Sequence, residues 1–413
     1  MTTGAEAARA TAPHLLRAAA EAILPGVVEV RRRLHRRPEI GLHLPQTQAV
    51  IAEALRALGL EPRVGGSTTS VTTVIEGARP GPTILLRADM DGLPLTEDTG
   101  LGFASEVPGA MHACGHDTHV AMLLGAARLL AERRDALAGR VLLMFQPGEE
   151  GYHGARFMLD EGLLVEGAHG AGGVERAVAI HISTRYPSAT IALRPGPLLA
   201  STDAIRATVR GRGGHASAPH LALDPIPTAA ELVLALQAAV SRSVDAFDPV
   251  VLTIARISGG TTNNIIPERV EIEGTIRTTS PENRALMRDL VRRVAAGVAA
   301  AQGTEIDLEI DEGYPVTLCD PDVTAWVRGL AAELAGEAAV LDMAHPIMGG
   351  EDFSYVTQRV PGMMAFLGAR PASEDPATAP QNHSNLVVFD EPSMALGVAL
   401  YAAAAIDFLG GDA

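Results

Sequence analysis

Three short apolar runs, with a helical stretch between the first two, constrain the fold of this chain more than any other feature. The runs lie at 83–87, 140–145 and 177–182, and residues 120–134 have the apolar spacing of a helix. Residues 14–59 before them also have helical spacing. An order of strand, helix and strand favours a sheet that is covered by helices. The sequence therefore predicts an α/β domain with a mixed sheet.

The segment 199–312 has a different pattern, in which alternating strands are mixed with two long helical stretches. Such a pattern predicts a smaller, compact α+β domain. The α/β pattern resumes after it, so we expect residues 1–198 and 313–413 to form one domain into which 199–312 is inserted. The expected strands of the insertion are 203–209, 250–257, 269–277 and 305–310, and its expected helices are 226–244 and 282–301.

Charge and composition exclude several classes of protein. The chain has 49 acidic and 33 basic residues, a formal net charge of −16, which opposes capture of nucleic acid or of an anionic membrane surface. The longest apolar run, 394–406, is shorter than the roughly 20 residues that span a bilayer, so we expect a buried helix. Residues 1–26 lack the apolar centre of a signal peptide, and two cysteines cannot form a disulfide framework. We therefore expect a cytoplasmic protein.

The segment MHACGHD, residues 111–117, places Cys114 two residues before His116. On one helix these side chains would point in different directions, so they are poorly placed as a nucleophile and its base. In a loop they can converge on a metal ion, and thiolate with imidazole suits zinc, while manganese, cobalt and nickel stay open. Taken alone, the segment also fits the commoner case of a buried thiol beside a helix-capping Asp117.

Two other segments place polar side chains near the ends of predicted strands. Glu149 and Glu150 are adjacent in QPGEEG, and crowding two carboxylates costs free energy unless they share a cation or a proton. His181 stands inside an apolar strand. A solvated acidic loop and a core histidine are the ordinary interpretations of each segment alone. Because open α/β sheets bind ligands outside their strand ends, the segments together indicate a ligand site.

These motifs, taken in order along nearly the whole chain, resemble those of the M20-type metallopeptidases. The closest resemblance is to the branch of N-acyl-amino-acid amidohydrolases that includes hippurate hydrolase and the indole-acetyl-amino-acid hydrolases. The matching segments are LHRRPEIG (34–41), LRADMDGLP (86–94), MHACGHD (111–117), QPGEEG (146–151), GRGGHASAPH (211–220), GGTTNNIIPE (259–268), GTIR (274–277), GGEDFS (349–354) and NHS (382–384), with His181 between them.

The resemblance implies a catalytic α/β domain with a two-metal site, and a smaller inserted domain that acts as lid and dimerisation surface. Many relatives bind metal through a His-x-Asp strand motif, whereas the equivalent strand here, residues 87–91, offers no histidine. Cys114 and His116 would replace it, with Cys114 bridging two divalent ions. The implied metal ligands are Cys114, His116, Glu150, His181 and His383.

The same resemblance implies roles for residues around the metal ions. Glu149 would be the general base, and Asp117 would orient His116. In the lid, His215 would approach the oxyanion, either within its own chain or across a dimer interface. Asn264 and Arg277 would hold a substrate carboxylate. Without the family, the ordinary interpretation is that His215 stabilises a turn and that Arg277 lies on an exposed strand.

The sequence thus predicts a metal-dependent amidohydrolase that cleaves N-acyl-amino acids, of the aminoacylase or hippurate-hydrolase type, and that forms a homodimer or a larger homo-oligomer. A dipeptidase or a deacetylase of an N-acetyl intermediate is the alternative within the class. A cysteine hydrolase that uses Cys114 is the alternative from another class, and a binding protein without activity on the same scaffold is a third possibility.

Overall fold

The computed structural model describes residues 13–165 and 173–410. The first twelve residues, part of the segment that we expected to lack a signal peptide, lie outside this range. The chain divides into two compact units. The larger unit contains Met1–Leu198, Leu318–His345 and Tyr355–Ala413, and the smaller contains Leu199–Thr317 and Pro346–Ser354.

The smaller unit is therefore longer than the inserted segment that the sequence pattern indicated. Pro346–Ser354 belongs to it, although this segment has no helical or strand pattern that would connect it with the insertion. The connection is made by hydrogen bonds, because the amide of Ala200 donates to the carbonyls of Ile347 and Gly349.

The larger unit is built on an eight-stranded mixed sheet. The four central strands β4, β3, β5 and β16 run parallel, whereas β2 is antiparallel to β4 and β6 is antiparallel to β16. This confirms the predicted α/β fold with a mixed sheet. In order across the sheet the strands are β1 (Arg63–Val64), β2 (Val71–Glu76), β4 (Ala138–Gln146), β3 (Arg79–Asp89), β5 (Val174–Pro187), β16 (Gly362–Arg370), β6 (Ile191–Leu193) and β15 (Val340–Asp342).

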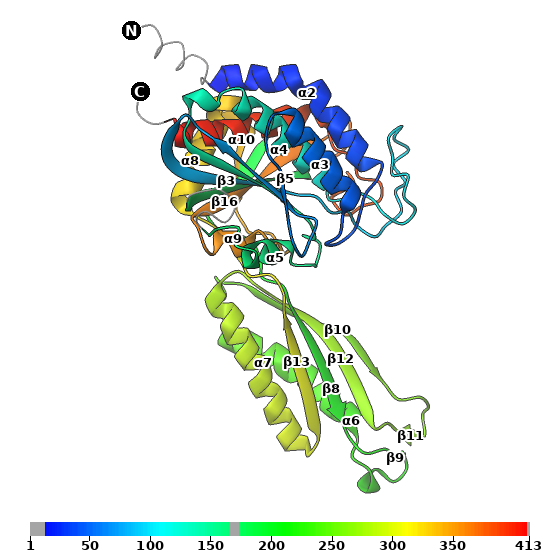
Figure 1. Ribbon diagram of the computed structural model, residues 1–413. Coiled ribbons are helices and arrows are strands. Elements are labelled where there is room, and N and C mark those ends of the chain that lie inside the picture. Colours follow the sequence, from blue (N-terminus) through cyan, green and yellow to red (C-terminus); the bar gives the residue numbers. More distant parts are fainter. Residues whose placement is uncertain (1–12, 166–172, 411–413) are drawn as a thin grey trace. The chain divides into compact units, whose positions relative to one another are not determined.

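Helices cover this sheet, and Figure 1 shows α2, α4 and α10 together on one side of it. Pro45 is the first residue of α3, where its missing amide hydrogen costs nothing. The helix α4 begins at His116, four residues before the helix that the pattern predicted. The helices are α2 (Pro13–His35), α3 (Pro45–Ala57), α4 (His116–Ala131), α5 (Gly154–Asp160), α8 (Pro321–Ala335) and α10 (Met394–Leu409).

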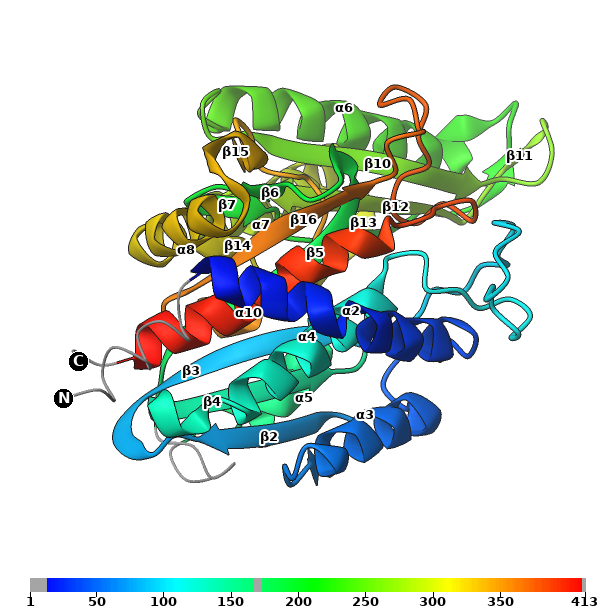
Figure 2. The same cartoon turned by 90° about the horizontal axis from the view of Figure 1, so that it is seen from above.

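The helix α10 is a core element. The segment Glu391–Leu409 is long and apolar enough to cross a membrane by length and composition, yet 83% of its apolar 18-residue window is buried inside the fold. It packs against α2 and α4, and Figure 2 shows these helices side by side. This burial fits the expectation of a buried helix, because a core helix of a globular protein is apolar on all sides.

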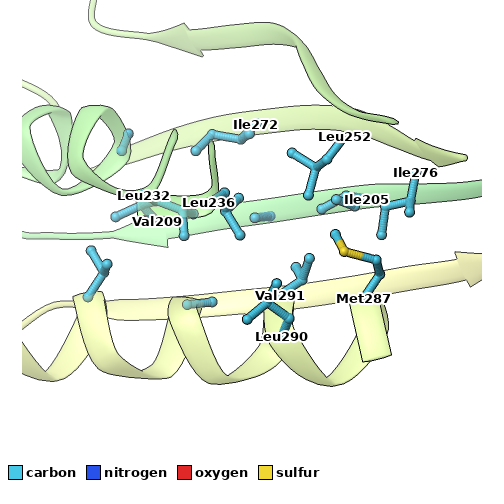
Figure 3. Close-up of a cluster of buried hydrophobic side chains, with 14 of the residues drawn as sticks. Ile205, Val209, Leu232, Leu236, Leu252, Ile272, Ile276, Met287, Leu290 and Val291 are labelled. Atoms are coloured by element: carbon cyan, nitrogen blue, oxygen red, sulfur yellow. The ribbon is translucent and has the colours of Figure 1, made fainter. Parts of the chain in front are cut away.

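The smaller unit consists of a four-stranded antiparallel sheet and two helices. Side chains of β8 alternate between buried and exposed, and the buried face meets both helices in one apolar cluster (Figure 3). In order across the sheet the strands are β10 (Val250–Gly259), β12 (Arg269–Thr278), β8 (Asp203–Arg210) and β13 (Glu305–Glu312), and the helices are α6 (Pro225–Ser243) and α7 (Pro281–Gln302).

The remaining elements are short. Two of them, β9 and β11, pair with each other at the end of the smaller unit and matter for the site residues below. They are β9 (Gly214–His215), β11 (Ile265–Ile266), β7 (Gly196–Leu199), β14 (Thr317–Cys319), α9 (Ser354–Thr357), and the 3₁₀ turns Arg134–Ala136, Pro219–Leu221, Glu337–Ala339 and Glu391–Ser393.

Candidate metal centre

The loop before α4 and the first residue of this helix bring the Cys114 and His116 side chains to the end of the large sheet. Gly115 lies between them with a φ of 88°, in the left-handed region that favours glycine. A Cβ atom at this position would lie 2.4 Å from Cγ2 of Ile182. The sharp turn and the close contact with β5 therefore both require glycine, and this explains why the helix begins only at His116.

The five expected metal ligands gather in the larger unit. Sγ of Cys114 lies 3.4 Å from Nε2 of His181 and 3.3 Å from Nε2 of His383. The ligand atoms form two groups within which all atoms lie less than 4.8 Å apart. Cys114 belongs to both groups, together with His116 and His181 in one and with Glu150 and His383 in the other.

Unsatisfied polar atoms show that this cluster fits a cation. Both ring nitrogens of His116 are buried and make no hydrogen bond within the described part of the chain. The carboxylate oxygens of Asp91 and Asp89 lie 3.4 and 3.5 Å from them. Burial alone would lower the pKa of His116, but Asp89, Asp91 and Glu150 raise it to about 10. Surroundings that hold a proton so firmly are rich in negative charge and suit a divalent ion, which competes with protons for the same ligands.

The structure also fixes the orientation of the two remaining histidines. Nδ1 of His181 donates to the carbonyl of Ile182 at 2.7 Å. In a neutral ring Nε2 is then unprotonated, and its lone pair is available on the side of Cys114. His383 has a φ of 72°, a backbone conformation that is uncommon outside glycine, and its amide donates to the carbonyl of Ala113 at 2.9 Å. Strained residues of this kind concentrate at functional sites.

Asp91 organises the two adjacent glutamates, and the sequence analysis did not assign it a role. Its Oδ1 accepts the amide of Glu149 at 3.0 Å and its Oδ2 accepts the amide of Glu150 at 3.1 Å. Oε1 of Glu150 lies 3.1 Å from Nε2 of His383, while Glu149 groups with His116 and Glu150. The two carboxylates thus have different neighbours. The second acidic residue of LRADMDGLP was the signal that could have identified Asp91.

The contacts of Asp117 correct the expectation that it orients His116. Its Oδ2 accepts hydrogen bonds from Nε of Arg31 and from Nδ1 of His35, both at 2.8 Å. Burial alone would raise the pKa of Asp117, but Arg31 and His35 hold it far below its usual range. The carboxylate beside the His116 ring is instead that of Asp91. Neighbouring residues of a helix point in different directions, so Asp117 faces α2 while His116 faces the cluster.

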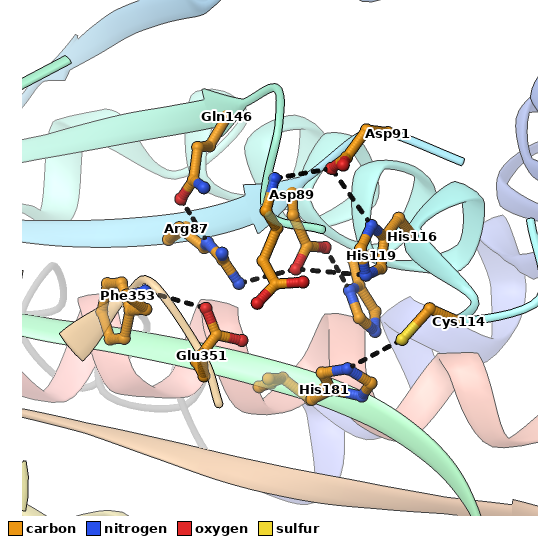
Figure 4. A network of polar contacts seen from close by, with 12 residues as sticks. Arg87, Asp89, Asp91, Cys114, His116, His119, Gln146, His181, Glu351 and Phe353 are labelled. Atoms are coloured by element: carbon orange, nitrogen blue, oxygen red, sulfur yellow. Dashed lines mark hydrogen bonds and ion pairs between the residues drawn. The ribbon is translucent and has the colours of Figure 1, made fainter. Parts of the chain in front are cut away.

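A second buried network, drawn in Figure 4, was not predicted from the sequence. Nη1 of Arg87 donates to Oδ2 of Asp89 at 2.7 Å, and Nε of Arg87 donates to the side-chain oxygen of Gln146 at 2.9 Å. Nδ1 of His119 lies 2.5 Å from the other oxygen of Asp89. Burial alone would raise the pKa of Asp89, but Arg87 and the neighbouring histidines hold it well below its usual range. The spacing of His116 and His119, which places them on one helix face, was the available signal.

The smaller unit separates the residues that we expected to hold a substrate carboxylate. His215 pairs with Ile265, and the carbonyl of Asn264 accepts the amide of Ala216 at 3.1 Å, so His215 and Asn264 are close in the fold. Asn264 lies shortly before Arg269, the first residue of β12, whereas Arg277 lies near the last residue of that strand. At a rise of 3.3 Å per residue, Arg269 and Arg277 are about 26 Å apart. Asn264 and Arg277 of one chain therefore do not converge, which corrects the expectation for a single chain.

A cluster of thiolate, imidazole and carboxylate groups, at the carboxyl ends of parallel strands in an α/β sheet, fits the class of metal-dependent hydrolases that act on amide or peptide bonds. Comparison with known families agrees. The chain belongs to peptidase family M20/M25/M40, whose model matches residues 85–407. This confirms the resemblance on which the sequence analysis relied.

Individual relatives cover most of the chain. Thermostable carboxypeptidase 2 of Saccharolobus solfataricus is 39% identical over 386 residues, which is 92% of this chain and 95% of the relative. N-acetyl-L-cysteine deacetylase of Bacillus subtilis is 39% identical over 342 residues, 83% of this chain and 80% of the relative. Among solved structures, the YXEP protein of Bacillus subtilis, described as a dinuclear metal-binding peptidase from the M20 family, has a TM-score of 0.80 at 32% identity, and the match covers 94% of this chain and 99% of that chain.

Proposed function

We propose that this protein is an amidohydrolase that contains two divalent metal ions and cleaves N-acyl-amino acids into a carboxylic acid and a free amino acid. The observation that carries the proposal is that Cys114 belongs to two adjoining groups of metal-ligating atoms, beside which stands a further glutamate. Similarity to a deacetylase of N-acetyl-L-cysteine supports an acylated amino acid as the substrate. Similarity to a carboxypeptidase keeps a peptide substrate, and thus a dipeptidase, as the alternative.

In this proposal Cys114, His116 and His181 would hold one ion, and Cys114, Glu150 and His383 would hold the other. Bound there, the ions would polarise the amide carbonyl and lower the pKa of a water molecule. Thiolate and imidazole suit zinc, while the carboxylates also admit manganese, and cobalt and nickel accept the same set.

Glu149 then acts as the general base of the reaction. Its carboxylate would accept a proton from the attacking water and later deliver it to the leaving nitrogen of the amide. The side chain is 6% exposed, and Asp91 fixes its backbone, so the carboxylate is held in place and shielded from bulk water. The neighbouring Glu150 faces His383, which is why two adjacent glutamates can have different tasks.

The lid residues complete the proposal. His215 would donate a hydrogen bond to the oxyanion, and Arg277 or Asn264 would bind the substrate carboxylate, for which the two N–H groups of a guanidinium are well shaped. Nδ1 of His215 accepts the amide of Ser217 at 3.1 Å, so the proton of a neutral ring is on Nε2 and can be donated. Because Asn264 and Arg277 lie far apart in one chain, contact of one substrate with both requires a homodimer.

The surroundings of Cys114 are unfavourable for a cysteine hydrolase. Reactive cysteines lie in electropositive and partly exposed sites. Burial and the carboxylates of Glu150 and Glu149 instead raise the pKa of the Cys114 thiol well above its usual range. Both cysteines are free thiols, Cys319 being fully buried elsewhere, so we assign the protein to a reducing compartment, the cytoplasm.

Removal and return of metal test this function directly. Protein stripped with a chelator is expected to lose hydrolysis of N-acetyl, N-benzoyl and indole-acetyl amino acids, and added Zn²⁺ or Mn²⁺ is expected to restore it. Mass spectrometry of the products, with dipeptides in the same panel, measures the outcome. Cleavage of dipeptides alone would favour the alternative substrate, whereas activity that persists without metal and is lost on alkylation of Cys114 would contradict the proposal.

Mixing two inactive variants tests whether the site is shared between two chains. Glu149→Gln removes the general base beside the metal ions, and His215→Ala removes the histidine of the lid. If the lid of one chain serves the site of the other, refolding an equal mixture should recover about a quarter of the wild-type activity, because about half of the dimers are hybrids and half of the sites in each hybrid are intact. Each variant alone, taken through the same refolding, is the control. Recovery no greater than the controls would mean that His215 acts within its own chain.

A further inference from the structure

The parallel pairing between β3 and β5 ends before the metal centre. The last pair of the ladder is Arg87 with Ala179, whereas β5 continues to pair with β16 up to Ile182 and beyond. On the side of β3, the amides of Ile180 and Ile182 donate to side chains instead. The hydroxyl of Tyr401 on α10 accepts the first at 2.9 Å, and Nε2 of His119 on α4 accepts the second at 2.7 Å.

The contact with Ile182 determines the protonation of the His119 ring. A backbone amide can only donate, so Nε2 of His119 carries no proton. The proton is therefore on Nδ1, which donates to Asp89 at 2.5 Å. Asp89, His116 and His119 lie close enough together to hold an ion, but both ring nitrogens of His119 are already used. His119 is thus not a metal ligand in this arrangement.

The peptide groups of Ile182 connect His119 to the expected ligands. The carbonyl of Ile182 accepts Nδ1 of His181 at 2.7 Å and the side-chain amide of Asn382 at 2.9 Å. Asn382 also donates to the carbonyl of Cys114 at 3.0 Å. The position of this one residue therefore sets the ring of His181 and supports the segment that carries Cys114.

We infer that His119 is a positioning residue of the metal centre: it connects the Asp89 carboxylate to the Ile182 amide and thereby holds His181 in place for metal binding. The buried Arg87 stabilises the Asp89 carboxylate by forming an ion pair with it, and Arg87 itself donates a hydrogen bond to Gln146. The inference goes beyond the proposed function but rests on its assignment of His181 as a ligand. Outer partners of this kind, when removed, typically lower metal affinity by roughly 10- to 100-fold.

The test is a measurement of metal affinity in His119 variants. In His119→Phe an aromatic ring remains at this position, but it cannot form hydrogen bonds to Asp89 or Ile182. Competition with a chromophoric chelator should show that one of the two ions binds roughly 10- to 100-fold more weakly than in the wild type. Tyr401→Phe is the matched control, since it removes the corresponding hydrogen bond to Ile180, together with the one that the Tyr401 hydroxyl donates to the carbonyl of Arg87 at 2.6 Å. It should lower the melting temperature and leave both metal affinities unchanged.

Two amide variants keep the test decisive if His119→Phe does not fold. Glutamine can reach the Ile182 amide with its oxygen, so His119→Gln should restore most of the affinity. The shorter asparagine can bond to Asp89 but not to Ile182, so His119→Asn should not. Wild-type metal affinities in folded His119→Asn, or in His119→Phe if it folds, would overturn the inference. A wild type that binds no ions, or a His181→Ala variant that still binds both tightly, would instead overturn the ligand assignment of the proposed function.

Discussion

Replacing Glu149 with glutamine is expected to lower kcat by roughly 100- to 10,000-fold while the protein keeps its metal ions. The amide has nearly the size and shape of the carboxylate, and the backbone amide of residue 149 still donates to Asp91. What is lost is the ability to accept a proton from water and to return it to the leaving nitrogen. Steady-state kinetics on the best substrate of the panel and elemental analysis of the same sample measure both effects.

Glu150→Gln is the matched control, because it makes the same chemical change one residue away. Glu150 faces His383 and belongs to one of the two ligand groups, so its loss should lower metal content as well as activity. The two variants should therefore differ in metal content: Glu149→Gln loses catalysis with metal bound, and Glu150→Gln loses metal. If Glu149→Gln hydrolysed substrate as fast as the wild type, the assignment of the general base would be wrong.

The proposed ligands were reached through the resemblance to the M20 family, because each segment taken alone also fits an ordinary structural role. Cys114 with His116, and Glu149 with Glu150, combine residue types that few structural roles require so close together. The strand ends of an α/β sheet then explain how such motifs meet. Hydrophobic periodicity predicted the strands 83–87, 140–145 and 177–182, which lie within β3, β4 and β5, and the strands and helices expected in 199–312, which correspond to β8, β10, β12, β13, α6 and α7.

The supporting contacts could not be predicted, because their partners are far apart in the sequence. Asp117 meets Arg31 across 86 residues, and His119 meets Ile182 across 63. No local pattern encodes such a pairing. Whether a histidine such as His119 binds metal or supports a ligand depends on which of its ring nitrogens already form hydrogen bonds, and the sequence does not show this. The separation of Asn264 and Arg277, by contrast, could have been predicted from the sequence. The predicted strand 269–277 already placed Arg277 at the end away from Asn264, so strand length alone could have excluded their convergence in one chain.

Cys114→Ala is expected to weaken the binding of both metal ions, by more than the roughly 100-fold that follows loss of an outer partner. Its sulfur is the atom common to the two ligand groups, with His181 and His383 at 3.4 and 3.3 Å, so a single substitution removes one ligand from each. Activity should fall with metal content. Every other ligand belongs to one metal-binding group of this pair, and its removal should mainly affect one ion.

Two further cysteine variants distinguish this effect from a general loss of packing. Cys319→Ala removes the other buried thiol, whose sulfur accepts the amide of Met364 at 3.4 Å, and should leave metal content unchanged. Cys114→Ser offers an oxygen in place of sulfur and should therefore retain manganese better than zinc, because hard ions prefer oxygen ligands. Isothermal titration of the metal-free proteins measures both affinities. A Cys114→Ala protein that binds two ions with wild-type affinity would show that the thiolate is not shared. The two ions would then have to be held by imidazole and carboxylate ligands alone.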